Sequence, residues 1–197
     1  MSYPKIILLR HGQTEWNLEG RYQGQKDSPL TDKGKKQAKN NALKLKESIE
    51  NFDKIKIFSS PLARAKSTAF IICDELNIDR DKIIFEKRIS EFDFGIFEGE
   101  LKSFCQTTYA KEYNAREADK WSYQIENGES YELVTKRLKL WFDEVKDEEV
   151  IIVIAHEMIN RALRGFYLNL EQSEILKLRQ PNDVVLVLEE SGEREII

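Results

Sequence analysis

Short apolar runs alternate along the chain with longer stretches in which apolar residues recur every three or four positions. The runs occupy residues 6–9, 54–58, 83–85, 150–155 and 184–188, and a weaker one ends the chain at 194–197. The runs at 6–9 and 150–155 are uninterrupted and rich in isoleucine and valine, which is typical of strands buried on both faces of a parallel sheet. The pattern therefore predicts a strand at each run.

The longer stretches have helical spacing and recognisable starts. Thr31 is placed as the N-cap of a helix through about residue 49, and Ser130 as the N-cap of a helix over 131–145. Ser60 and Pro61 are placed as the N-cap and first residue of a helix through residue 76, and another helix follows His156. Strands alternating with such helices predict a three-layer α/β/α sandwich around a mostly parallel sheet.

Two segments lack a clear period. Residues 12–30 are rich in Gly, Asn, Gln and Asp and predict a long functional loop. Residues 96–129 mix aromatic and charged residues; a helix over about 100–117 fits, and we expect this segment to form a cap over a site. Because no repeat, low-complexity tract or linker interrupts the pattern, residues 1–197 are interpreted as a single domain.

Composition narrows the range of partners and compartments. The net charge of −4 argues against nucleic acid as the main partner, because phosphate backbones require a concentrated basic surface. Cys73 and Cys105 stand alone, which argues against a structural zinc site and fits a reducing compartment. No apolar stretch reaches the length of a signal peptide core or a membrane span. We therefore expect a cytoplasmic protein with no membrane partner; a homodimer stays open.

Four basic or imidazole side chains fall at or near predicted strand ends. Arg10 and His11 follow the first strand, Arg64 lies in the first turn of the helix after the second, and His156 ends the strand at 150–155. Ligands of open parallel sheets bind at the carboxyl ends of the strands, so these residues predict one shared site. Two guanidinium groups, together with the N-termini of the helices predicted after Ser60 and His156, favour an anionic ligand. The number of donors favours phosphate over carboxylate.

The residues alone leave other interpretations open. A histidine at a strand end is more often only a hydrogen-bonded loop residue, and an arginine in a first helical turn is usually a solvated charge. Composition and periodicity therefore make phosphate chemistry one hypothesis among several.

A resemblance favours that hypothesis. The sequence LRHGQTEWN at residues 9–17 resembles the RHGxTxWN motif of the histidine phosphatase superfamily, which includes the cofactor-dependent phosphoglycerate mutases. The similarity continues, in order, at residues 21–24, 27–31, 34–38, 59–69, 91–99, 128–130 and 155–156. It covers most of the chain.

The resemblance implies a role for each matching residue. His11 would be the nucleophile that becomes phosphorylated, and Glu91 the general acid that protonates the leaving oxygen and then activates water. Arg10, Arg64 and His156 would bind the phosphoryl oxygens, and no metal or other cofactor would be needed. Further phosphate or substrate contacts would come from Asn17, Gln23 and Gly24.

The expected activity is that of a phosphatase acting on a small phosphorylated metabolite. A mutase must shield its phosphohistidine from water, and the short segment 96–129 leaves little material for that, so a mutase is the alternative. An idle phosphoester-binding module is the third interpretation, although His11, Glu91 and both arginines are present.

Some positions leave further choices open. Glu157 stands where the family commonly has glycine, and would either favour protonation of His156 or point to solvent. The leaving group could be recognised by aromatic residues of 92–123, which could equally form a packed cap. Lysines and arginines of the same segment, namely Lys102, Lys111, Arg116 and Lys120, could instead bind a second anionic group. Residues 180–182 are a candidate rim of the site.

Overall fold

The computed structural model describes residues 3–197 and contains one six-stranded sheet in that range. The strands are β1 (Lys5–Arg10), β2 (Lys56–Ser59), β3 (Ile83–Phe85), β4 (Val150–Ala155), β5 (Val185–Glu189) and β6 (Gly192–Ile196). Their order across the sheet is β3-β2-β4-β1-β5-β6. The first four are mutually parallel, while β5 pairs antiparallel with β1 and β6 antiparallel with β5. The predicted mostly parallel α/β sandwich is confirmed.

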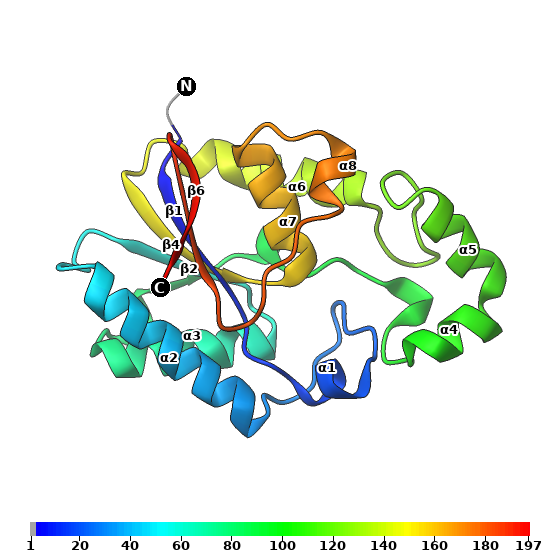
Figure 1. Ribbon diagram of the computed structural model, residues 1–197, viewed down its shortest axis with the longest axis horizontal. Helices are drawn as coiled ribbons and strands as arrows, with labels where there is room; N and C mark the ends of the chain where they lie inside the picture. The colour runs from blue at the N-terminus through cyan, green and yellow to red at the C-terminus, as the bar shows by residue number, and fades with distance from the viewer. Residues whose placement is uncertain (1–2) are drawn as a thin grey trace.

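The helices divide between the two faces of the sheet (Figure 1). On one face, α2 (Asp32–Ser48) and α3 (Ala63–Leu76) pack against Ile7, Leu9 and Ile152. On the other face, α6 (Tyr131–Val145) and α7 (Glu157–Tyr167) pack against Ile6 and Leu8. Alternate residues of the central strands thus serve opposite cores, which explains why β1 and β4 are apolar without interruption.

The remaining helices are short. They are α1 (Glu15–Glu19), α4 (Lys102–Thr108), α5 (Ala110–Ala118) and α8 (Gln172–Ile175), with 3₁₀ turns at Arg80–Lys82, Lys87–Ile89 and Gly95–Phe97. In Figure 1, α4 and α5 stand to one side of the sheet, beyond α1. The helix expected over 100–117 is divided at Tyr109, whose ψ of 41° departs from helical geometry. The loop expected over 12–30 contains α1, which sequence reasoning missed.

The predicted start of α3 is wrong. The helix begins at Ala63 and its N-cap position, Leu62, makes no side-chain capping bond. The carboxylate of Asp27 instead accepts hydrogen bonds from the amides of Ala63 at 2.7 Å and Arg64 at 3.3 Å. Ser60 is not the cap because it lies two residues before the N-cap position; its hydroxyl accepts the amide of Leu62 at 3.3 Å and also contacts a histidine ring. The predicted caps Thr31 and Ser130 are confirmed, since each accepts a first-turn amide.

Across residues 3–197, no helix combines the length and the apolar character that crossing a membrane requires.

Candidate active site

The register of the sheet brings distant segments to one edge. Arg10 lies opposite Ala155 in the β1–β4 pair, and Ser59 lies opposite Ile154 in the β2–β4 pair. The residues that follow each strand, His11, Ser60 and His156, therefore leave the sheet side by side. The two imidazole rings have their centroids 5.1 Å apart. The convergence expected from the strand ends is present.

His11 is buried, and its ring is held in one tautomer. Nδ1 lies 2.8 Å from the carbonyl oxygen of Gly12, which can only accept, so Nδ1 carries the proton and Nε2 keeps a free lone pair. The amide of Asn182 donates to the His11 carbonyl at 2.6 Å and fixes the backbone beneath the ring. Burial, followed by the charges of Arg64 and Arg10, holds the pKa of His11 well below 6.5. Near neutral pH the imidazole is uncharged.

His156 is also buried and is oriented by Ser60. Its Nε2 lies 2.7 Å from the Ser60 hydroxyl, which also accepts the amide of Leu62 at 3.3 Å. Because that hydroxyl has one proton, it can donate it to Nε2 and leave the ring proton on Nδ1. Nδ1 has no hydrogen-bond partner among residues 3–197. Burial and the neighbouring Arg64 lower the pKa of His156 well below 6.5.

The two arginines expected at the site lie there, each held by protein acceptors at one end. Arg64 is 1% exposed, and its Nη1 and Nη2 donate to the carbonyls of Lys26 and Gly24 and to Asp27. Arg10 donates through Nη1 to the carbonyl of Gln180 at 3.1 Å. In both, the buried Nε has no partner among the described residues. Buried, unpartnered donor groups on two cations are suited to an anion.

Glu91 lies in the same cleft and is buried. Its carboxylate accepts the amides of Phe92 at 2.9 Å and Met158 at 3.4 Å. Burial raises the pKa of Glu91 above 4.5, although the two amides and the nearby arginines oppose this. A carboxyl group with a raised pKa can hold a proton for donation.

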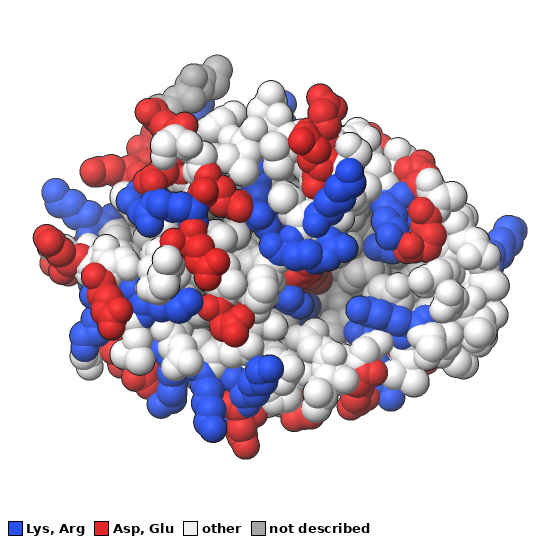
Figure 2. All heavy atoms as spheres, viewed as in Figure 1, with Lys and Arg blue, Asp and Glu red and all other residues white. Residues whose placement is uncertain are grey.

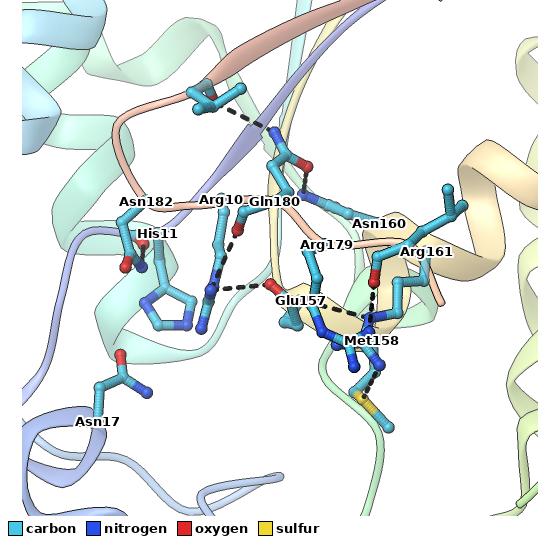
Figure 3. A network of polar contacts seen from close by, with 12 residues as sticks. Arg10, His11, Asn17, Glu157, Met158, Asn160, Arg161, Arg179, Gln180 and Asn182 are labelled. Carbon is cyan, nitrogen blue, oxygen red and sulfur yellow. Dashed lines mark hydrogen bonds and ion pairs between the residues drawn. The ribbon is translucent and has the colours of Figure 1, made fainter. Parts of the chain in front are cut away.

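The loop from residue 14 to 24 brings three more expected residues to the cleft. Asn17 accepts the amide of Thr14 through Oδ1, which leaves its NH₂ group without a described partner. Asn17 lies across from the His11 ring in Figure 3. Gln23 donates to the Thr14 hydroxyl. Gly24 has a φ of +56°, in the left-handed region, and a Cβ there would lie 1.8 Å from a side-chain oxygen of Glu98, so this position favours glycine.

A cleft of about 370 Å³ is lined by His11, Arg10, Arg64 and Glu91 and by the loop residues Asn17, Gln23 and Gly24. His156 and Ser60 are fully buried behind His11 and are not part of the cleft lining. Eight lining residues are basic (Arg10, Arg21, Arg64, Lys102, Arg116, Lys120, Arg161 and Arg179) and three are acidic (Glu91, Glu117 and Glu157). In Figure 2, lysine and arginine side chains surround the hollow to the right of centre. A protein with a net charge of −4 thus carries a local cationic cleft. This surplus of charge favours an anionic ligand.

The segment 96–129 contributes one wall of this cleft. Lys102, Tyr113, Arg116, Glu117 and Lys120 line it. Phe94 and Tyr113 are the expected aromatic residues that reach the cleft, whereas Phe92 and Phe97 are core residues and Trp121 stacks on Tyr131. Burial and the neighbouring Arg10 and Arg116 lower the pKa of Lys102. This wall is mainly polar and charged.

Sequence reasoning missed two partners of the site. Ser60 was interpreted as a helix cap, and Asp27 was recognised as part of a motif without a role. Each acts across a long sequence separation, on His156 and on Arg64 respectively, so no local pattern indicates it. The expectation for Glu157 is corrected: its carboxylate neither contacts His156 nor points to solvent, but forms ion pairs with Arg10 and Arg161. Gln180 and Asn182 bond to Arg10 and to the His11 carbonyl, but they do not line the cleft, so the interpretation of 180–182 as its rim stays a prediction.

A protein site for a metal ion usually needs several His, Cys, Asp or Glu side chains that converge on one point. Within residues 3–197, no group of three or more His, Cys, Asp or Glu side chains is placed to hold a metal ion.

Comparison with known proteins identifies the class. The family described as the histidine phosphatase superfamily (branch 1) matches residues 6–197. Phosphoserine phosphatase 1 of Hydrogenobacter thermophilus is 33% identical over 196 residues, covering 98% of this chain and 90% of that protein. The chain belongs to the histidine phosphatase superfamily. Within it, the chain is a phosphoric monoester hydrolase.

Other relatives agree with this class. Human 6-phosphofructo-2-kinase/fructose-2,6-bisphosphatase 3 is 33% identical over 183 residues, and this chain spans about a third of its length (93% of this chain, 33% of that protein). The solved alpha-ribazole phosphatase of Shigella flexneri has a TM-score of 0.82 at 22% identity, covering 98% of this chain and 95% of that one. A mycobacterial glucosyl-3-phosphoglycerate phosphatase, solved with VO3, has a TM-score of 0.80 at 24% identity, covering 98% of this chain and 96% of that one. At these identities the structures establish the fold.

Proposed function

We propose that the protein hydrolyses phosphate monoesters of small metabolites through a phosphohistidine on His11. The observation that carries this is the tautomer of His11: its Nδ1–H donates to the Gly12 carbonyl, so the lone pair of Nε2 is available beside two arginines whose Nε groups are buried and unpartnered. A neutral imidazole is a competent nucleophile, and its lowered pKa keeps it neutral.

In the first step, Nε2 of His11 attacks phosphorus and the bond to the ester oxygen breaks. Glu91 gives its proton to that oxygen, which leaves as an alcohol. In the second step, the Glu91 carboxylate takes a proton from water, the water oxygen attacks phosphorus, and the phosphorus–nitrogen bond breaks. Inorganic phosphate then leaves, and both residues return to their starting states.

The other residues of the cleft stabilise the phosphoryl group. Arg10 and Arg64 offer their unpartnered Nε groups, and His156 offers Nδ1–H while Ser60 holds its other nitrogen. Asn17 offers its free NH₂ group, and Gln23 and Gly24 shape the loop beneath. Donors fixed in advance cost little reorganisation when charge develops on the phosphoryl oxygens. These positive groups supply the charge, so we propose that no metal takes part.

The substrate class follows from the cap side of the cleft. We propose that residues 96–129 act as a cap within a single catalytic domain, and that the leaving group carries a second anionic group. Lys102 has no carboxylate partner among the described residues, and Arg179 is bonded only to backbone carbonyls. Phosphoserine, the substrate in the name of one relative, has such a carboxylate.

The test is phosphate release from a panel of phosphorylated metabolites, including phosphoserine, 3-phosphoglycerate and its bisphosphate. We expect phosphate release from the members whose leaving group carries a second anionic group. The His11→Ala variant should show no turnover above background, with a fold unchanged by circular dichroism. Substantial residual turnover of His11→Ala would refute the covalent route. Isomerisation without phosphate release would instead identify a mutase.

A further inference from the structure

Glu157 is a partly buried carboxylate at the first position of α7, with its side chain 15% exposed, and the proposed steps do not use it. Oε2 lies 2.8 Å from Nη1 of Arg10, and Oε1 accepts from Nη2 of Arg161 at 2.7 Å and from its Nε at 3.2 Å. Both oxygens thus face guanidinium groups, as the close view in Figure 3 shows. An acidic residue in a first helical turn is favourable in itself, but that alone does not direct it toward Arg10.

The position of Glu157 differs from that of the other two acidic residues of the cleft. Glu117 pairs with Arg116 and Lys120 on the cap side, and Glu91 is bonded to backbone amides. Of the three, only Glu157 forms an ion pair with an arginine proposed to bind the phosphoryl group. Its charge therefore acts directly at the place where phosphate binds.

We propose that Glu157, acting through Arg10, sets how tightly the cleft holds inorganic phosphate and so promotes release of the product. This rests on the proposed function. Phosphate carries between one and two negative charges near neutral pH, and a carboxylate on the far side of the same guanidinium repels it. Arg10 keeps its orientation because the carbonyl of Gln180 and Glu157 together fix Nη1, which leaves Nε for the ligand.

Two substitutions separate charge from orientation. Glu157→Gln keeps the shape and an acceptor oxygen but removes the charge, whereas Glu157→Asp keeps the charge on a shorter side chain. We expect Glu157→Gln to tighten phosphate binding by roughly tenfold, because one nearby charge at an effective dielectric of about 20 contributes at least that much. Glu157→Asp and the matched control Glu117→Gln should change phosphate binding less than about threefold, because Asp keeps the charge and Glu117 is paired with Arg116 and Lys120 and not with Arg10.

Calorimetric titration gives the Kd of inorganic phosphate, and steady-state assays give its inhibition constant. The Tm is recorded for every variant. Glu157→Gln should lower both the inhibition constant and KM without raising kcat, since release becomes slower. Unchanged or weaker phosphate binding in folded Glu157→Gln, or equal tightening in Glu117→Gln, would overturn the proposal. If Glu157→Gln proves too unstable, the charge-keeping Glu157→Asp decides: tightening there would equally overturn it. Absence of phosphate release by the unsubstituted enzyme would refute the proposed function while the binding comparison still stands.

Discussion

Replacement of Glu91 by glutamine tests the chemistry at the leaving oxygen. The carboxylate is held by the amides of Phe92 at 2.9 Å and Met158 at 3.4 Å. A glutamine oxygen can keep the shorter of these bonds, and its NH₂ group then faces only the longer one. We therefore expect the fold to tolerate the change, while the proton for the leaving oxygen is lost.

The size of the effect depends on the leaving group. An alkoxide is a poor leaving group, so an alkyl phosphate should lose about 10²–10⁴-fold in kcat/KM, the usual range for general acid catalysis. That corresponds to about 2.7–5.4 kcal/mol of transition-state stabilisation. A nitrophenyl phosphate has a leaving group that is stable without a proton, so its kcat/KM should fall by less than about tenfold.

The assay compares kcat/KM for the two esters, because this ratio reports the first phosphoryl transfer and not the hydrolysis of phosphohistidine. With Glu91 absent as a base, that second step should slow, and nitrophenyl phosphate should give a burst of product close to the enzyme concentration. Equal losses of kcat/KM for both esters would refute the role of Glu91 as leaving-group acid.

Two further predictions concern pH and metals. For an alkyl phosphate, kcat/KM should fall as the pH decreases through the pKa of His11, which burial and two arginines hold well below 6.5, and again as the pH increases through the pKa of Glu91, which burial raises above 4.5. Glu91→Gln should remove the second decrease from the pH–rate profile, and its persistence would show that another group causes it. EDTA should leave turnover unchanged, because Arg10, Arg64 and His156 are proposed to supply the positive charge; a loss that added metal restores would contradict the metal-free proposal.

The sheet and its main helices could be predicted from the sequence because each has a local cause. Strands buried on both faces need continuous apolar runs, and Thr31 and Ser130 cap helices whose first turns follow directly. The grouping of His11, Arg64 and His156 follows from the rule that parallel strands end at one edge. Two of the six strands, β5 and β6, run antiparallel, which the periodicity of a short run does not reveal.

The parts that could not be predicted depend on contacts between distant segments. Ser60 has the sequence context of a helix cap, and only the approach of His156, 96 positions later, gives its hydroxyl a second partner. Glu157 directly follows His156 in the sequence, yet the Glu157 carboxylate pairs with Arg10 and Arg161. Side-chain direction at a strand end or helix start is set by packing, which local sequence does not specify.

The cap of α3 has a consequence for how the site holds together. Its first two amides are bonded to Asp27, 36 and 37 positions away, and the same carboxylate binds the side chain of Arg64. A helix end without a local cap is poorly stabilised until that loop arrives. Arg64 in turn binds the carbonyls of Gly24 and Lys26. Loop, helix start and anion-binding arginine therefore share one set of contacts, so local opening of any one of them would release the other two.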